Sequence, residues 1–252
     1  DVYVIKIASG FYQNKLLGLS NGQGMMVVFD QKNGKPLGLL QDEGYLTDVR
    51  TAVAGAICAK YLAPNNIQAI GIIGTGVQAR MQLEYLKSVT DCRSAIVWGR
   101  SKSALDQYRT SMADSGFIIE TTMALDQVTD NCNLIVTCTA SEKPLIIKDQ
   151  IKGKIHITAM GSDTPNKQEL DSNVLSKADL IIADSRSQCE VRGEIHHAIK
   201  NKIVSMDSIV ELGEIINGDR RGRTTGSALT VADLTGVAVQ DIQISKAVLS
   251  NI

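Results

Sequence analysis

The stretch Ala69-Ile-Gly-Ile-Ile-Gly-Thr-Gly-Val-Gln-Ala79 decides the expected fold. It reads as a short apolar strand, a tight glycine turn and the start of a helix. Gly74, Gly76 and Ala79 fill the pattern G-x-G-x-x-A. In that pattern the first glycine permits the turn, the second lets a pyrophosphate approach the backbone, and the alanine keeps the helix close to the strand. Free N–H groups and the dipole at the helix start favour a bound phosphate.

The glycine pattern alone also describes an ordinary glycine-rich turn, so its surroundings matter. A helical stretch at 77–88 and a second apolar strand at 94–98 follow it in the order of a βαβ unit. Further strands are expected at 134–137, 155–159 and 180–183, with helices at 103–115 and 173–177. Short apolar strands separated by helices indicate a buried parallel sheet. We therefore predict an α/β domain, a doubly wound parallel sheet of the Rossmann type, that binds a nicotinamide dinucleotide.

The end of the second strand bears on which dinucleotide is bound. An NAD-specific site usually has Asp or Glu there, whereas an arginine can meet the 2′-phosphate of NADP. Arg100, supported by Ser101 and Lys102, therefore favours NADP over NAD. The alternative is that Arg100 stacks on the adenine of NAD. Thr137, Cys138 and Thr139 end a later strand at the same edge, where they are expected to line the nicotinamide side.

Composition excludes several classes of function. The net charge of −1 over 252 residues argues against nucleic acid or anionic membrane as a partner. No apolar run is long enough to span a bilayer. The five cysteines are scattered without a C-x-x-C pair, and the three histidines have no partners at ligand spacing. We expect no metal, no disulfide framework and a cytoplasmic location.

A smaller second domain is expected from both ends of the chain. Strands at 2–8, 25–29 and 37–40, with a hairpin turn at 32–36, indicate an antiparallel sheet. A helix at 47–62, capped by Thr47 or Asp48, leads out of it. A final capped helix from about Thr235 is expected to pack back on this sheet, and the charged stretch 219–223 is interpreted as a solvated loop rather than a phosphate site. The predicted α+β substrate and dimerisation domain is thus discontinuous, with residues 1–63 and 220–252 flanking a dinucleotide domain at 64–219.

Several stretches together resemble the ornithine cyclodeaminase/mu-crystallin family, over almost the whole chain. The matching stretches are Lys6-Ile-Ala-Ser-Gly10, Gly18-Leu19, Asp42-Glu-Gly-Tyr-Leu-Thr-Asp-Val-Arg-Thr51, Gly74-Thr-Gly-Val-Gln-Ala79, Gly161-Ser-Asp-Thr-Pro165 and Asp233-Leu-Thr-Gly236. The resemblance implies a homodimer of two-domain subunits, with substrate held between the domains. It also implies several dozen residues before the point where this chain starts.

The resemblance carries functional roles to particular residues. It places Lys6 and Arg50 at the substrate carboxylate, Arg50 also near the cofactor, and Asp163 as the proton-transferring residue. Further positions match a substrate contact, Thr235, and cofactor contacts, namely Asn21, Val77, Gln78, Thr139, Met160, Lys167 and Leu234. Asn21 departs from the threonine more usual at its position.

The three charged residues also make chemical sense as a set. An arginine can bind a carboxylate through two parallel charge-assisted bonds, and a lysine adds a second positive charge. Asp163 follows an apolar strand, at the end where open α/β sheets bind ligands. Each residue also has an ordinary interpretation: Arg50 as a structural helix residue, Lys6 as a solvated strand lysine, and Asp163 as the cap of a turn.

Three activities remain open from the sequence. The leading hypothesis is an NAD(P)H-dependent reductase of small imino acids, running in reverse as an amino-acid dehydrogenase. The second is an ornithine cyclodeaminase-type lyase that forms proline and ammonia with recycled NAD. The third is a non-catalytic protein that binds NADPH and a ligand, as mu-crystallin-like members do. The tail 233–241 resembles the reductase branch more than the true cyclodeaminases.

Overall fold

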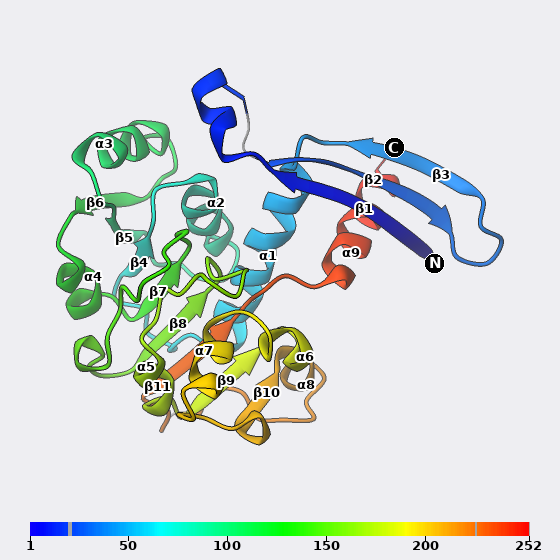
Figure 1. Ribbon diagram of the computed structural model, residues 1–252. Coiled ribbons are helices and arrows are strands. Elements are labelled where there is room, and N and C mark those ends of the chain that lie inside the picture. The colour runs from blue at the N-terminus through cyan, green and yellow to red at the C-terminus, as the bar shows by residue number, and fades with distance from the viewer. Residues whose placement is uncertain (20–21, 225, 252) are drawn as a thin grey trace. The chain divides into compact units, whose positions relative to one another are not determined.

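The computed structural model describes residues 1–19, 22–224 and 226–251. Contacts divide the chain, coloured by residue number in Figure 1, into two compact units. Unit 1 contains Asp1–Thr51 and Gly236–Ile252, and unit 2 contains Ala52–Thr235. In this division residues 52–63 and 220–235 group with the parallel sheet of unit 2.

Unit 1 is built on a three-stranded antiparallel sheet in the order β1-β2-β3. The strands expected from the sequence are confirmed as β1 (Val2–Gly10), β2 (Gly22–Asp30) and β3 (Pro36–Gln41), and a 3-10 helix, η1 (Tyr12–Leu17), follows β1. The expected hairpin turn joins β2 to β3. Asp30 organises this turn, since its carboxylate accepts a hydrogen bond from the Lys32 N–H at 2.7 Å.

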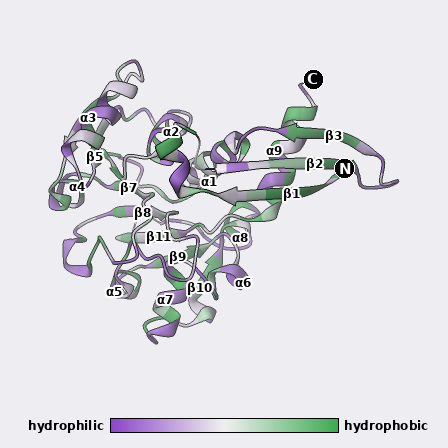
Figure 2. Ribbon diagram, turned by 45° about the horizontal axis from the view of Figure 1, so that its top comes forward, coloured by the Kyte–Doolittle hydropathy of each residue, from purple (hydrophilic) through white to green (hydrophobic). Residues whose placement is uncertain are grey.

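The two faces of this sheet differ. The final helix α9 (Ala238–Leu249) packs on one face, where the Ser245 hydroxyl is 3.3 Å from the sulfur of Met26. Hydrophobic colouring recurs along β1, β3 and α9 in Figure 2. The opposite face, here called the open face, carries apolar side chains that are at least 40% exposed: Tyr3, Ile5, Ile7, Leu37 and Leu39.

Helix α1 (Tyr45–Leu62) begins two residues before the expected start. Neither Thr47 nor Asp48 caps it. Asp42 does, because its Oδ2 accepts a hydrogen bond from the Leu46 N–H at 2.6 Å. Positive φ values at Glu43 (51°) and Gly44 (88°) turn the chain so that Asp42 reaches the first helical turn. The sequence pattern indicates Thr47 or Asp48 as the cap because the turn at 42–44 comes before the stretch with helical character.

Unit 2 contains the predicted doubly wound parallel sheet, with eight strands in the order β10-β9-β11-β8-β7-β4-β5-β6. Every neighbouring pair in it is parallel. The strands are β4 (Ile70–Ile73), β5 (Ser94–Trp98), β6 (Ile118–Thr122), β7 (Leu134–Thr137), β8 (Ile155–Ala159), β9 (Leu180–Ala183), β10 (Ile209–Glu211) and β11 (Leu229–Asp233). The helices are α2 (Val77–Leu86), α3 (Lys102–Ser111), α4 (Leu125–Asn131), η2 (Lys148–Gln150), α5 (Ser172–Ser176), α6 (Arg186–Cys189), α7 (Glu194–Lys200), η3 (Met206–Ser208) and α8 (Leu212–Ile216).

Strand β4 lies between β5 and β7, so the order of the strands reverses there. Open α/β sheets bind ligands outside the carboxyl ends of their strands at such a reversal. Here, the carboxyl edge denotes the edge of the unit 2 sheet at which its strands end.

Three strands, β6, β10 and β11, were not expected from the sequence. Strand β11 follows the Gly/Arg-rich stretch that was assigned to the other domain. Its place is fixed by pairing with β8 and β9, with Leu229 opposite Ile155 and Thr230 opposite Leu180. Such long-range pairing has no local signal. Strand β6 has only two apolar residues, followed by three polar ones, because it lies at the sheet edge.

The final helix also begins later than expected, at Ala238 rather than about Thr235. The Thr235 N–H and hydroxyl are instead bonded to Asp184, at 2.8 and 3.1 Å. Gly236 then adopts a φ of 81°, and Val237 provides no side-chain cap. The expected cap on this helix is therefore wrong.

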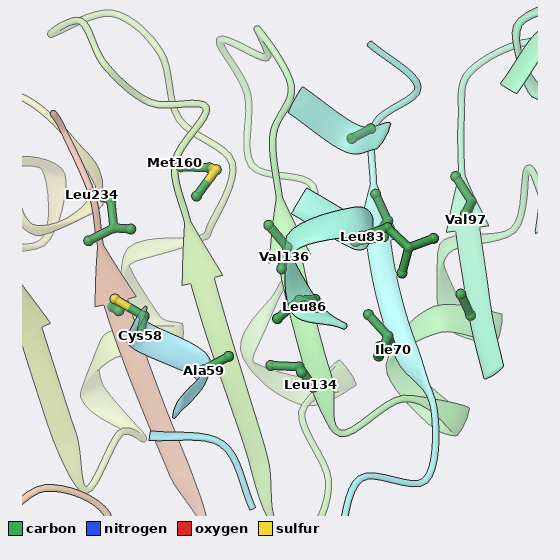
Figure 3. Close-up of a cluster of buried hydrophobic side chains, with 14 of the residues drawn as sticks. Cys58, Ala59, Ile70, Leu83, Leu86, Val97, Leu134, Val136, Met160 and Leu234 are labelled. Atoms are coloured by element: carbon green, nitrogen blue, oxygen red, sulfur yellow. The ribbon is translucent and has the colours of Figure 1, made fainter. Parts of the chain in front are cut away.

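Two hydrophobic clusters hold the parallel sheet. In the one drawn in Figure 3, Leu83 and Leu86 of α2 pack with Ile70 of β4 and Val136 of β7. All four are essentially inaccessible to solvent. This packing fixes α2, and with it the preceding glycine turn, against the first strand of the sheet. No helix in the described part of the chain combines the length and apolar character needed to cross a membrane.

Candidate functional site

The glycine turn lies at the carboxyl end of β4, beside the strand reversal. Gly74 has a φ of 132°, and a Cβ there would lie 3.0 Å from the Cys138 carbonyl oxygen, so the position requires glycine. A Cβ on Gly76 would meet no atom within 4 Å. Gly76 is also the N-cap of α2. Because glycine has no side chain, the first N–H groups of this helix receive no side-chain cap. Open space next to uncapped helix N–H groups fits a pyrophosphate.

Gln78 and Ala79, which follow Gly76 in α2, are held by hydrogen bonds within unit 2. Gln78 accepts a hydrogen bond at 3.2 Å from Gln82, one turn further along α2. The carbonyl of buried Ala79 accepts a bond from the Tyr108 hydroxyl at 3.0 Å, which ties α2 to α3. Val77, between the turn and Gln78, is 47% exposed.

The segment after β5 separates into one exposed arginine and two residues with local roles. Ser101 is the N-cap of α3, and its hydroxyl oxygen accepts a bond from the Ala104 N–H at 3.3 Å. Lys102 pairs with Asp106 at 3.1 Å on the surface. Arg100 is exposed at the end of the strand. Of the three, Arg100 is the one whose position best suits a charge on the adenosine side of a dinucleotide.

The ends of β7 and β8 meet at a buried acidic residue that sequence reasoning missed, Glu169. The fully buried Thr137 donates its hydroxyl hydrogen to Glu169 at 2.7 Å, and the Thr139 N–H and hydroxyl do the same at 2.6 and 2.7 Å. The pKa of Glu169 is raised, because burial raises it more than these hydrogen bonds lower it. Nothing local indicated this role, since Lys167-Gln-Glu-Leu170 reads as a polar loop.

Cys138 lies between these two threonines and is half-buried. Its thiol is 3.5 Å from the Ile73 carbonyl, and burial, with the charge of Glu169, raises its pKa. A thiol kept protonated is a poor nucleophile. Met160 and Leu234, both assigned to the cofactor, lie at the ends of neighbouring strands and are 8% and 5% exposed.

Asp163 and Lys167 form an ion pair in the loop after β8. Their Oδ1 and Nζ atoms are 2.6 Å apart, and the Asp163 side chain is 55% exposed. The Lys167 carbonyl accepts a bond from a ring nitrogen of His197 at 2.9 Å. A half-exposed carboxylate beside a lysine can exchange a proton with a ligand that reaches it.

Lys6 and Arg50 lie in unit 1 and meet at a second residue that sequence reasoning missed, Asp241. Its Oδ1 is 2.9 Å from Lys6 Nζ and 3.3 Å from Arg50 Nε. Arg50 also donates to Gln240 Oε1 at 2.7 Å. A substituent on Gly236 would lie 2.7 Å from the Arg50 guanidinium. The acidic residue in the first turn of the final helix was the available signal for this role.

Two further residues, Thr235 and Asn21, were assigned to the site by the family resemblance. Thr235 is bonded to Asp184, as described above. Asn21 lies outside the described residues.

In the part of the chain that the structure describes, no group of three or more His, Cys, Asp or Glu side chains has the arrangement to hold a metal ion.

Comparison with known proteins gives relatives over nearly the full chain. An uncharacterised cyclodeaminase, y4tK, of Sinorhizobium fredii is 40% identical over 245 residues, which is 96% of this chain and 74% of that protein. An archaeal alanine dehydrogenase dimer with bound NAD superposes with a TM-score of 0.92 at 32% identity, covering 99% of this chain and 77% of that one. The iminosuccinate reductase of Paracoccus denitrificans in complex with NAD⁺ gives 0.92 and 32%, covering 99% and 76%.

These relatives confirm the α/β fold, and the two solved ones are a dehydrogenase and a reductase with NAD bound. The family model described as the ornithine cyclodeaminase/mu-crystallin family matches residues 1–252. The resemblance inferred from the sequence motifs is thereby confirmed, and the chain belongs to the ornithine cyclodeaminase/mu-crystallin family.

Proposed function

We propose that the protein is a nicotinamide-dinucleotide-dependent oxidoreductase of small imino and amino acids. The observation that carries this proposal is the Gly74–Gly76 turn, which lies at the strand reversal and offers open space beside the uncapped start of α2. A phosphate binds such a turn through backbone N–H groups and the helix dipole. The solved dehydrogenase and reductase relatives support the assignment of hydride chemistry to this fold.

In this proposal the cofactor supplies the hydride, and residues of the chain bind the substrate and move its proton. Lys6 and Arg50, which already share one carboxylate in Asp241, bind the carboxylate of the substrate. Asp163 exchanges a proton with the substrate nitrogen while hydride moves at the neighbouring carbon. The Lys167 ammonium, 2.6 Å from Asp163, holds this carboxylate in place in the loop after β8.

The choice between NADPH and NADH rests on one residue. Arg100 is exposed two residues after the end of β5, and no acidic residue stands in its place to bind the ribose hydroxyls of NAD. This charge supports NADPH, while the two solved relatives named above hold NAD. We therefore propose that both cofactors are accepted and that Arg100 contributes to the affinity for NADPH.

We also propose that the chain forms a homodimer through the open face of unit 1. Tyr3, Ile5 and Ile7 of β1 are 40%, 51% and 58% exposed there. Tyr3 stacks on Phe29 of β2, with ring centroids 4.8 Å apart. A contiguous apolar sheet face of this kind marks a protein–protein interface. The alanine dehydrogenase relative is described as a dimer.

The test of the activity follows oxidation of NADPH or NADH by absorbance, with cyclic imines, iminosuccinate, and 2-oxo acids with ammonia as substrates. We expect substrate-dependent turnover that Asp163→Asn lowers by about 100-fold or more in kcat, because general acid–base groups contribute at that scale. Asp207→Asn is the matched control. Asp207 lies in η3, before β10, at the opposite edge of the sheet, and its loss should leave turnover unchanged.

Two outcomes would replace this proposal. Ammonia and proline formed from ornithine with catalytic NAD, without turnover of any imine, would assign the cyclodeaminase reaction. Cofactor binding without turnover in either assay would assign a binding protein. Retention of full activity by Asp163→Asn would remove Asp163 from the mechanism.

A further inference from the structure

Glu169 gathers four hydrogen-bond donors from two segments at the carboxyl edge. Its Oε1 accepts bonds from the N–H and the hydroxyl of Thr139, and its Oε2 accepts bonds from the Thr137 hydroxyl (2.7 Å) and the Gly161 N–H (2.8 Å). The side chain is fully buried. Two of these partners are backbone N–H groups, which can only donate, and the other two are hydroxyls, so Glu169 accepts the hydrogen bonds of both backbone groups.

The four bonds begin where the sheet ends. Thr137 and Ala159 are the last paired residues of β7 and β8, and the Met160 N–H still reaches the Thr137 carbonyl at 3.0 Å. Beyond that bond the Thr139 and Gly161 N–H groups both turn to Glu169. The carboxylate therefore replaces the next rung of the ladder and holds the two segments together after they leave the sheet.

Gly161 shows how closely these segments are pressed together. A Cβ on Gly161 would lie 2.1 Å from the Thr139 carbonyl oxygen and 2.6 Å from the Glu169 carboxylate. Real side chains do not approach this closely, so the position requires glycine. The conformation of both segments thus depends on the carboxylate between them.

The main chain of Glu169 is anchored independently of its side chain. The N–H groups of Glu169 and Leu170 donate to the Glu194 carboxylate at 2.8 and 3.0 Å, and the Glu169 carbonyl accepts a bond from Leu145 at 2.7 Å. Glu194 begins α7, whose Ile195 N–H donates to Asp233 at 2.8 Å. A change in the Glu169 side chain should therefore leave its backbone in place.

The segments held by Glu169 lie on one particular side of the strand reversal. Arg100 follows β5, on one side of β4, whereas β7 and β8 lie on the other side. A dinucleotide that binds over the glycine turn with its adenosine half towards β5 directs its nicotinamide half over β7 and β8. Burying a carboxylate is costly unless it is well hydrogen-bonded, and here the four hydrogen bonds offset that cost.

We propose that Glu169 is a positioning residue that fixes the Thr137–Thr139 turn and the Gly161 backbone in the conformation that receives the nicotinamide half of the dinucleotide. The inference rests on the proposed function, because that function supplies the dinucleotide. Glu169 does not touch the cofactor in this proposal. It acts through the two segments that it holds.

The test compares the affinities of Glu169→Gln for NADH and for ADP-ribose, which lacks the nicotinamide. In the variant an amide NH₂ faces one of the two backbone N–H groups, so at least one bond is lost. We expect the Kd for NADH to rise about tenfold or more, and the Kd for ADP-ribose to stay within about twofold of the wild-type value. Binding is measured by titration calorimetry on the full chain, with thermal unfolding recorded alongside.

Asp179→Asn is the matched control. Asp179 also accepts bonds from two backbone N–H groups, those of Ala228 and Leu229 at 2.7 and 2.9 Å, but at the amino end of β11. It should leave both affinities unchanged. If Glu169→Gln does not fold, Thr137→Val takes its place, because it removes one of the four donors from a fully buried side chain.

The outcomes separate this inference from the function on which it rests. Selective loss of NADH affinity supports the positioning role. Unchanged NADH affinity, or equal loss of both ligands, overturns it. If the wild-type protein binds neither NADH, NADPH nor ADP-ribose, then the proposed function itself fails, and the positioning role fails with it.

Discussion

Two glycines at the carboxyl edge differ in their tolerance of a side chain. A Cβ on Gly161 would collide with the Thr139 carbonyl, whereas a Cβ on Gly76 would meet nothing within 4 Å. Stability therefore explains glycine at position 161 but not at position 76. The space at Gly76 is what a pyrophosphate needs in order to approach the backbone.

Gly76→Ala should accordingly separate stability from binding. We expect the free energy of unfolding to change by no more than about 1 kcal/mol, because the backbone there is extended and the added methyl group has room. The Kd for NADH or NADPH should rise about tenfold or more, because the methyl group occupies the phosphate approach. Urea denaturation and calorimetric titration measure the two effects.

Gly213→Ala is the control for this change. It also adds a methyl group in open space near a helix start, but in α8, beyond the edge strand β10. It should keep full cofactor affinity. An unchanged affinity in Gly76→Ala would mean that no phosphate binds at this turn.

At the scale of elements, the pairing of β8 with β11 is held by buried polar groups. The His156 ring nitrogens are 2.8 Å from the Thr230 hydroxyl and 3.0 Å from the Thr158 hydroxyl. Arg223 donates to the Thr230 hydroxyl at 2.9 Å and to the carbonyls of Leu62 and Ile155. The interpretation of 219–223 as a solvated loop is therefore wrong at Arg223, which joins α1, β8 and β11.

This pairing should make stability depend on pH. Burial, and then the charge of Arg223, lower the pKa of His156 from 6.5 to about 3. Between these two values the unfolded chain binds a proton at this residue and the folded chain does not. Stability is therefore lost as the pH falls below 6.5, by about 1.4 kcal/mol per pH unit for this group.

Asp233 has the opposite effect, because burial raises its pKa to about 7, so that protonation favours the folded state as the pH falls. The effect of His156 is therefore measured as the difference in unfolding free energy between wild type and His156→Asn. We expect the unfolding free energy of the wild type minus that of His156→Asn to fall by about 2–3 kcal/mol between about pH 6 and about pH 4. His196→Asn, which removes an imidazole from α7 outside the sheet, should reproduce the wild-type profile. A difference that does not vary with pH would refute the assignment.

At the scale of the whole molecule, the open face of unit 1 carries several apolar side chains that are at least 40% exposed. The register places Ile5 opposite Val27, and Val27 opposite Leu39, so these apolar side chains share one face. Helix α9 covers the other face. An apolar face of a three-stranded sheet is costly to leave in water.

Ile5→Glu should therefore disrupt self-association. The wild-type protein is expected to sediment as a dimer, and the variant as a monomer, because each interface would bury two unpaired carboxylates. Ile118→Glu is the control, since Ile118 is 75% exposed on the edge strand β6 of unit 2 and should leave the dimer intact. A wild-type monomer, or a dimer that survives Ile5→Glu, would exclude this interface.

Local patterns predicted much of the fold because their physical causes are local. The apolar runs at 94–98, 134–137, 155–159 and 180–183 correspond to strands with those same bounds. A run of apolar residues between turn residues reports burial directly. Strand β10 has three residues, and β11 follows a stretch of Gly and Arg, so neither has enough local signal.

The residues of the candidate site likewise divide into those that the local sequence predicts and those that it does not. Gly74, Gly76 and Ala79 are readable because a turn with φ near 132° and a close helix each require a particular small residue. Lys6, Arg50 and Asp163 came from chemistry and family motifs. Glu169 and Asp241 were missed because the sequence does not distinguish a buried acidic residue from a solvated one. Only the residues that lie around it in the folded chain reveal its role.

The sequence by itself thus determined the parallel α/β fold, the glycine turn and the family, because each depends on residues that are adjacent or regularly spaced. Only the tertiary structure decided that β11 lies between β8 and β9, that Asp241 holds Lys6 and Arg50 together, and that Glu169 closes the gap between Thr139 and Gly161. These facts join residues up to 235 positions apart. The free energy that selects them comes from burial and hydrogen bonding across the whole chain, which no short stretch of sequence contains.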